Sequence, residues 1–444
     1  MKQNHEIKDP IHAFVKHDSV ERQVINSRPF QRLRHIHQLS MAYLVYPGAT
    51  HRRFEHSLGV MELASRVFDV VTDKNKLNDR LRNSLEQVNS VDQLAYWRRV
   101  LRMAALCHDL GHLPFSHGIE GLLPEGWDHE RMTRILICSD EMKPLWQSMR
   151  PPLDPIDIVK LAVGPQKATD LTFSDWEAIL AEIVTGDAFG VDRMDYLLRD
   201  SLHTGVPYGE FDHYRLIDTL RILTPPSESG VGDTSLEPSL GIEKGGLAAA
   251  EAMLLARYYM FRTVYFHPVV RIYGIHLMDF LFAWLDGSPL PIDPVNYLLL
   301  TDNEVMTDLL KAARDRDRKG HDPARRIVER AHYKVLYEWN QKDASQNPRI
   351  GRDVFDAAEK EFGKDAVRYD KLPPKSGKID FLVLLRTGEP SFASTESSIL
   401  DQIPPQKGEY VFIDPNRLKD AQKWLKTNFD RIVKNPGSVN NEES

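Results

Sequence analysis

The sequence predicts a mainly α-helical protein with a small α+β lobe toward its C-terminal end. Apolar residues recur with the period of an α-helix through most of the first three quarters of the chain, where strand-like alternation is scarce. Beyond about residue 340 the pattern changes. Residues 379–385 (IDFLVLL) and 408–414 (GEYVFID) are typical of strands, and the segment PNRLKDAQKWLKTNF after them is typical of a helix.

The clearest helical patterns are HSLGVMELASRVFDVV, which starts at His56, and WRRVLRMAALCHDLGH, which starts at Trp97. Between them, residues 72–92 are charged and rich in asparagine with little apolar pattern, so we expect an exposed helix or an insertion between two core helices. Proline and glycine clusters predict loops, and the cluster at 224–241 predicts a loop or a small hairpin.

The length of 444 residues is enough for a large core and more than one structural unit. The changes in pattern along the chain suggest three parts. We expect a core over residues 1–340, an α+β lobe over 341–434 and a disordered tail over 435–444.

Composition limits the classes of function. The formal net charge of −7 argues against a protein dominated by nonspecific DNA binding, although a local basic pocket for a small anion is compatible with it. Cys107 and Cys138 are too few for a thiolate metal cluster, so histidines and carboxylates must hold any metal, and a reducing compartment is expected. The N-terminus is polar, and no apolar run approaches the roughly 18 to 20 residues of a membrane span. We therefore expect a cytoplasmic protein without a membrane partner.

The stretch CHDLGHLPFSH (107–117) is unusual in placing histidines and an aspartate at the end of an apolar helical run. Burying the ionised Asp109 there without a partner would be costly, so a cation is expected nearby. His108 and Asp109 can converge on one metal ion, and His56 and Asp192 are candidate ligands from other helical segments. Nitrogen and oxygen ligands suit a divalent ion such as Zn, Fe, Mn, Ni or Mg, and the sequence does not choose between them.

The order His, His-Asp, Asp resembles the HD-domain phosphohydrolases, specifically their deoxynucleoside triphosphate triphosphohydrolase branch. The similarity spans roughly residues 9–338, and its blocks occur in the order of the family. It implies a helical HD-domain core and hydrolysis of a deoxynucleoside triphosphate (dNTP) to deoxynucleoside and inorganic triphosphate. The blocks are DPIHAFVKHDSVERQVINSRPFQRLRHIHQLS, YPGATHRRFEHSLGV, HDLGHLPFSH, WDHE, VDRMDYLLRDSLHTGV and RYYMFRTVYFHP.

The resemblance also implies roles for individual residues around the phosphates. His112, His117 and His129 match the catalytic histidines of the family. The reaction needs such residues because the leaving 5′ alkoxide must be protonated, and an imidazole can donate a proton near neutral pH. His117 is the favoured acid. Glu120 stands where the family often has Asp and would orient this group. The implied metal ligands are His56, His108, Asp109 and Asp192.

The remaining implied contacts bind the substrate. The implied phosphate contacts include arginines, which can bind phosphate bidentately. The implied sugar contacts are of two kinds, hydrogen bonds to the sugar and exclusion of ribonucleotides by the bulk of Tyr265. Arg193 replaces a more familiar lysine of the family. The implied positions are Arg53, Arg193, Tyr196 and Arg257 for the phosphates, and Gln38, Leu39, Asp200 and Tyr265 for the nucleoside.

The activator nucleotide site of some family members is altered in this sequence. Gln31 and Arg34 are kept, but Asn26 stands where a guanine-reading aspartate is expected, and an amide cannot accept both guanine hydrogens as a carboxylate does. We expect activation by GTP to be absent or rebuilt, and self-association into a dimer or tetramer to survive.

Two other functions fit parts of the sequence. The same metal site could act on another nucleotide phosphoester, because fold and metal do not fix the substrate. A nucleotide-sensing or single-stranded nucleic-acid-binding protein is the other alternative, and the acidic net charge does not favour it.

Overall fold

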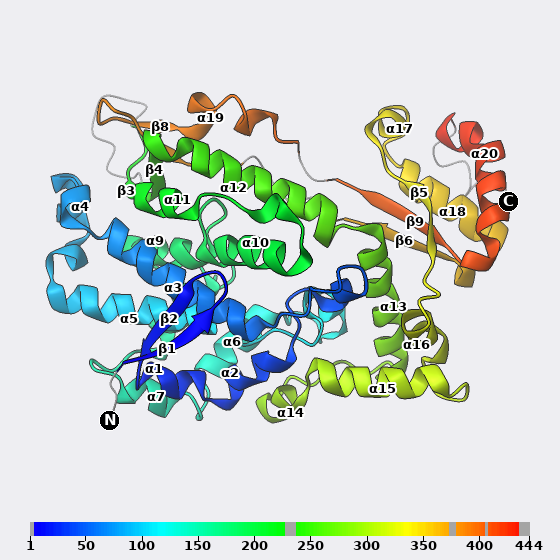
Figure 1. The fold of residues 1–444 in the computed structure, drawn as a ribbon, viewed down its shortest axis with the longest axis horizontal. Coiled ribbons are helices and arrows are strands. Elements are labelled where there is room, and N and C mark those ends of the chain that lie inside the picture. Colours follow the sequence, from blue (N-terminus) through cyan, green and yellow to red (C-terminus); the bar gives the residue numbers. More distant parts are fainter. Residues whose placement is uncertain (1–3, 227–236, 373–378, 405–406, 435–444) are drawn as a thin grey trace. The chain divides into compact units, whose positions relative to one another are not determined.

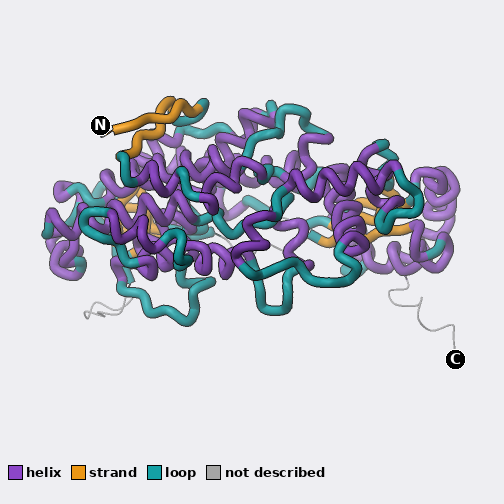
Figure 2. Tube along the Cα trace, turned by 90° about the horizontal axis from the view of Figure 1, so that it is seen from below, coloured by secondary structure: helices purple, strands orange, loops and turns teal. Residues whose placement is uncertain are grey.

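The computed structural model describes residues 4–226, 237–372, 379–404 and 407–434. The chain divides into two compact units, the first comprising Met1–Met260, Pro289–Glu304 and Lys378–Ile403, and the second Phe261–Ser288, Val305–Gly377 and Pro404–Ser444. Helices dominate the described chain (Figure 2), which confirms the predicted mainly α class. The predicted tail, residues 435–444, lies outside the described residues.

The first unit is built on a group of packed helices (Figure 1). Helix α3 packs against both α5 and α10, while α8 packs against both α5 and α9. The middle of α3 is buried on nearly all sides, which explains its almost continuous run of apolar and small residues. The bounds are α3 Arg53–Val71, α5 Val91–Cys107, α8 Pro155–Val163, α9 Asp175–Thr185 and α10 Val191–Thr204.

The segment between α3 and α5 is an insertion of short helices, as expected, but it is not devoid of apolar pattern. It contains α4 (Asp79–Ser84) flanked by two short 3₁₀ turns. Four of its apolar side chains are buried, and these are Leu77, Leu81, Leu85 and Val88. Their spacing of about four residues is helical. The pattern was missed in the sequence because charged residues separate these few apolar positions.

An N-terminal hairpin precedes the helices and was not predicted. Strand β1 (Asn4–Asp9) pairs antiparallel with β2 (Ala13–Asp18). Ala13, the first residue after the turn, has a φ of 62°. This left-handed conformation usually favours glycine, and because alanine stands here the sequence gave no sign of the turn.

A four-stranded sheet in the order β3-β4-β7-β8 completes the first unit. Its strands are β3 Leu220–Leu223, β4 Ser239–Glu243, β7 Leu382–Leu384 and β8 Pro390–Phe392. The first two pair antiparallel, as the expected hairpin at 224–241 requires, although residues 227–236 lie outside the described part.

The strand predicted within residues 379–385 forms as β7, but it pairs parallel to β4 of the first unit. The observed division of the chain therefore differs from the predicted boundary near residue 340. Residues 378–403 belong with the helical core, and residues 261–288 and 305–340 belong with the C-terminal segments. Strand pairing between distant segments, which local pattern does not encode, is the reason.

The second unit combines helices with a three-stranded antiparallel sheet in the order β5-β9-β6. The predicted strand at 408–414 and the helix after it are confirmed as β9 and α20. Helices α18 and α20 pack on this sheet around a core that includes Val354, Val411 and Ile432. The bounds are α13 Pro268–Trp284, α16 His321–Val328, β5 Lys334–Glu338, α18 Ile350–Phe362, β6 Val367–Lys371, β9 Glu409–Ile413 and α20 Leu418–Lys434.

The other helices are shorter or connect these groups. Judged by length and hydropathy, no helix in the described ranges qualifies as a membrane span. The bounds of these other helices are α1 Glu21–Ile25, α2 Arg28–Arg32, α6 His129–Ile137, α7 Lys143–Ser148, α11 His213–Thr219, α12 Leu247–Met260, α14 Pro294–Leu299, α15 Asp302–Arg314, α17 Gln341–Gln346 and α19 Ala393–Glu396.

Candidate active site

Three segments that are distant in the sequence meet at the predicted metal site. The first turn of α3 carries His56, and the C-terminal end of α5 is capped by His108. Asp192 lies in the first turn of α10, which packs across α3. The ligand atoms of these three side chains all lie within 4.8 Å of one another. Helix packing in the first unit therefore creates the cluster that the sequence predicted.

The available nitrogen and oxygen atoms fit a divalent cation. Asp192 Oδ1 lies 3.0 Å from His56 Nε2 and 3.5 Å from His108 Nε2. His108 Nδ1 donates to the carbonyl oxygen of Ala105 at 2.8 Å, and its Nε2 is buried without a hydrogen bond to any described residue. A buried nitrogen lone pair beside a carboxylate suits Zn, Fe, Mn, Ni or Mg, and the ligand set does not select one of them.

The fourth predicted ligand, Asp109, borders this trio and is engaged by a cation of the protein. Asp109 Oδ2 lies 2.6 Å from Arg53 Nη1 and 3.8 Å from His56 Nε2. Burial by itself raises the pKa of Asp109, but the charge of Arg53, with a smaller contribution from His108, holds that pKa well below its ordinary value. Asp109 is therefore ionised, and its compensating charge is Arg53.

His56 carries a strongly shifted pKa. Burial lowers this pKa, but hydrogen bonds to Asp192 and Asp195 and the neighbouring carboxylate charges raise it to about 10. A proton and a metal ion would therefore compete for the same imidazole nitrogen.

A second histidine group lies next to the trio. The His112 and His129 rings stack with centroids 4.1 Å apart, and His129 Nδ1 lies 2.5 Å from Glu120 Oε1. His112 Nε2 and His108 Nε2 each lie 3.3 Å from Asp109 Oδ1, so Asp109 stands between this group and the trio. Burial and the charges of Arg53 and His129 hold the pKa of His112 well below its usual value, so this imidazole is neutral. The side chain of His117 lies outside the described residues.

Two of the predicted phosphate contacts converge on one loop. Arg193 donates to the carbonyl oxygen of Gly186 at 2.8 Å and to Asp187 Oδ1 at 2.6 Å, and Arg257 donates to the carbonyl oxygen of Asp187 at 3.3 Å. Burial raises the pKa of Tyr196, and the charges of Arg193 and Arg257 oppose this rise. Arg193, Tyr196 and Arg257 thus form a cationic group in the first unit.

The predicted nucleoside contacts are divided between the two units. Gln38 and Leu39 follow an isolated bridge that joins His37 to Arg52, beside the start of α3. Asp200 accepts a hydrogen bond from His51 Nε2 at 2.7 Å. Tyr265 alone among the predicted site residues belongs to the second unit, where its ring packs against Phe261 in a π-helical turn.

The structure adds residues that the sequence reasoning missed. Asp195 contacts His56 Nδ1 at 2.8 Å, and Asp302 accepts a hydrogen bond from the backbone nitrogen of Phe115 at 2.8 Å. Asp195 had a usable signal, because it lies one helical turn after Asp192 within VDRMDYLLRD and so shares its face. Asp302 had none, since it is 187 residues from its partner.

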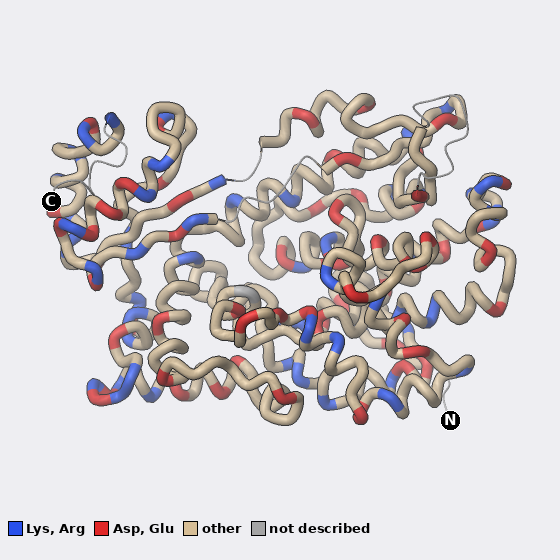
Figure 3. Tube along the Cα trace, turned by 180° about the vertical axis from the view of Figure 1, so that it is seen from behind, with Lys and Arg blue, Asp and Glu red and all other residues tan. Residues whose placement is uncertain are grey.

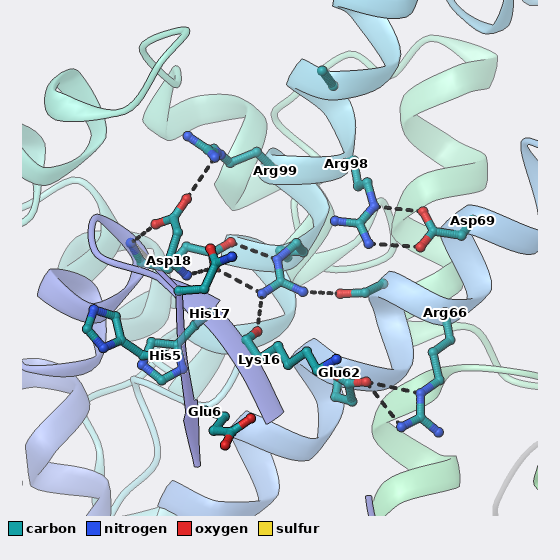
Figure 4. A pocket seen from close by; sticks show the side chains of 15 residues that line it. His5, Glu6, Lys16, His17, Asp18, Glu62, Arg66, Asp69, Arg98 and Arg99 are labelled. Carbon is teal, nitrogen blue, oxygen red and sulfur yellow. Dashed lines mark hydrogen bonds and ion pairs between the residues drawn. The ribbon is translucent and has the colours of Figure 1, made fainter. Parts of the chain in front are cut away.

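A cavity of about 730 Å³ lies against the N-terminal hairpin, and none of the predicted site residues lines it (Figure 4). Its arginines are paired with carboxylates of the protein, as Arg98 is with Asp69 and Arg99 is with Asp18. A phosphate would find little uncompensated positive charge there. The cavity therefore does not compete with the histidine clusters as a phosphate site.

Comparisons with known proteins agree with this architecture. The HD domain family matches residues 53–163, which include the His-Asp doublet, and the HD associated region matches residues 211–367. The structure of a hypothetical protein from Aquifex aeolicus covers 95% of this chain and all of its own, with a TM-score of 0.74 and 32% identity. The chain belongs to the HD-domain protein family.

Named relatives fall into two groups. Uncharacterized protein YwfO of Bacillus subtilis is 36% identical over 268 residues, which cover 60% of this chain and 52% of the relative. Deoxynucleoside triphosphate triphosphohydrolase SAMHD1 of Homo sapiens is 35% identical over 244 residues, which cover 50% of this chain and 37% of the relative. The matches span about half or less of the length of these curated relatives.

Proposed function

We propose that this protein is a metal-dependent dNTP triphosphohydrolase that releases deoxynucleoside and inorganic triphosphate. The observation that carries the proposal is the adjacency of two groups, the trio His56, His108 and Asp192 and the neighbouring pair His112 and His129. One group suits a divalent ion and the other suits proton transfer and phosphate contact. The name of the SAMHD1 relatives gives the substrate class that we adopt.

When bound, a divalent ion would act as a Lewis acid toward a phosphate oxygen. The side chains of the protein supply the remaining parts. Arg193 and Arg257 would hold the negative charge of the polyphosphate, and Arg193 can do so bidentately. Glu120 Oε1 lies 2.5 Å from Nδ1 of His129 and would orient this imidazole for proton transfer. The neutral His112 would donate or accept a hydrogen bond without adding charge.

The charge distribution supports a small anionic substrate over a nucleic acid. Lys and Arg are interspersed with Asp and Glu along the described trace (Figure 3), and the formal net charge of the chain is −7. A protein that binds the nucleic-acid backbone needs a continuous basic surface. An action on another phosphoester would use the same trio, so product analysis has to separate the two enzyme functions.

The test is incubation of purified protein with each of the four dNTPs and Mn²⁺, Mg²⁺ or Fe²⁺, with chromatography of the products. We expect deoxynucleoside and inorganic triphosphate in equal amounts. His108→Ala and Asp109→Ala should abolish the reaction, whereas His321→Ala, in α16 of the second unit, should not. Release of orthophosphate or pyrophosphate in place of triphosphate would show a different phosphohydrolase. Salt-dependent oligonucleotide binding without hydrolysis would favour the nucleic-acid alternative.

A further inference from the structure

The carboxylate of Asp195, which is not one of the predicted metal ligands, contacts the predicted ligand His56 at its second ring nitrogen. Asp195 Oδ2 lies 2.8 Å from His56 Nδ1, on the side of the ring opposite to the nitrogen that faces Asp192. Both side chains are fully buried. An imidazole that donates Nδ1–H to a carboxylate keeps its Nε2 lone pair for a metal ion. The contact thus sets both the tautomer and the ring orientation that the trio needs.

Asp195 is itself held by a dense set of donors. Arg199 donates through Nε and Nη2 to the two carboxylate oxygens at 2.8 and 2.9 Å, and His12 Nε2 lies 2.6 Å from Oδ1. Asp9 accepts from Arg199 Nη1 at 3.0 Å and from the backbone nitrogen of His12 at 2.9 Å. The N-terminal hairpin therefore contributes two side chains to this network, His12 to Asp195 and Asp9 to Arg199.

The backbone of α3 is shaped to admit this carboxylate. Gly59 lies three residues after His56, on the same face of the helix. A Cβ at Gly59 would lie 1.9 Å from Asp195 Oδ1 and 2.5 Å from Arg199 Nη2. A glycine in the middle of a helix is unfavourable relative to alanine, so its presence here accommodates the close approach of Asp195 and Arg199.

We propose that Asp195 is a positioning residue that orients His56 for metal binding, with Arg199, His12 and the space at Gly59 holding it in place. This inference rests on the proposed metal site. A purely structural Asp195–Arg199 ion pair would affect folding stability alone. A positioning role also sets the affinity of the folded protein for the metal.

The experiment measures the dissociation constant of Mn²⁺ for the full chain by isothermal titration calorimetry, without substrate. Asp195→Asn removes the charge that holds His56, and Gly59→Ala pushes the carboxylate aside while favouring the helix. We expect each to weaken Mn²⁺ binding about 10- to 100-fold. His12→Gln should have a smaller effect in the same direction. Thermal melting in EDTA identifies which variants are folded, and only folded variants are compared.

The matched control is Gly274→Ala, a helical glycine in α13 with no atom within 4 Å of the added carbon. It should leave the Mn²⁺ affinity unchanged. Wild-type affinity in folded Asp195→Asn, Gly59→Ala or His12→Gln would overturn the positioning role. If His108→Ala abolished Mn²⁺ binding at the same time, the metal site itself would stand. A wild-type protein that binds Mn²⁺ but does not hydrolyse dNTPs would refute the proposed function and leave this inference intact.

Discussion

Arg53 Nη1 lies 2.6 Å from Asp109 Oδ2, so a predicted phosphate-binding arginine is paired with the aspartate of the His-Asp doublet. Both side chains are at least nine-tenths buried, and Arg53 also donates to Ser116 Oγ at 2.7 Å. The protein thus supplies its own counter-charge to Asp109.

Replacing Arg53 should leave a buried carboxylate without its cation. We expect Arg53→Gln to lower the free energy of unfolding in EDTA by about 3 to 5 kcal/mol, measured by urea denaturation. Saturating Mn²⁺ should restore part of this loss. As a control, Arg98→Gln breaks a half-exposed pair with Asp69 and should cost less than about 1 kcal/mol. Equal losses in the two variants would contradict the importance of the buried pair.

Glu120 should affect turnover more than substrate binding. Because its carboxylate holds His129 at 2.5 Å, Glu120→Gln would loosen the imidazole without removing a phosphate contact. We expect kcat to fall by up to about 100-fold with KM nearly unchanged. Glu120→Asp, which restores the residue type common in the family, should keep most of the activity. An increase in KM at constant kcat would assign Glu120 to substrate binding.

Asp302 should stabilise a strained loop beside the predicted catalytic histidines. Phe115 and Ser116 have φ values of 56° and 66°, an unfavourable conformation for residues other than glycine. Asp302 accepts hydrogen bonds from the backbone nitrogens of Phe115 and His37, both at 2.8 Å. Asp302→Ala should therefore lower the free energy of unfolding by about 3 kcal/mol or more. The exposed helix cap Asp293→Ala provides the comparison and should cost clearly less.

Glu182 makes stability depend on pH. Burial raises the pKa of Glu182 to about 7, although the backbone nitrogen of Leu240 donates to it and lowers the pKa. Its folded-state pKa exceeds the ordinary value of 4.5, so the stability it contributes is complete below pH 4.5 and is lost as the pH rises through 7. Glu182→Gln should gain about 2 to 3 kcal/mol relative to wild type between pH 5 and pH 8, measured by chemical denaturation. A constant difference across this range would show that Glu182 titrates normally.

GTP should not be an obligatory activator. Asn26 is exposed at the end of α1 and offers an amide where a guanine-reading aspartate is expected. We expect dNTP turnover to change little when GTP is added, and light scattering to detect a dimer or tetramer without GTP. A large obligatory activation by GTP would refute this expectation.

Much of the fold followed from local pattern. The helical periods that begin at His56 and Trp97 became α3 and α5, and β9 and α20 formed where strand and helix were predicted. The hairpin closed at Ala13 escaped prediction because its turn carries no glycine. The partner of β7 also escaped, because β4 lies about 140 residues earlier and pairing is decided by the assembled sheet.

The sequence by itself determined the chemistry that is available, namely a helical scaffold with histidines and aspartates at helix ends and no thiolate cluster. Tertiary structure decided which of these groups touch. It placed Asp192 beside His56 and His108, paired Asp109 with Arg53, and brought Asp195 to the back of His56. The physical reason is that helical periodicity fixes which face a residue occupies, whereas the packing of α10 against α3 fixes which faces meet.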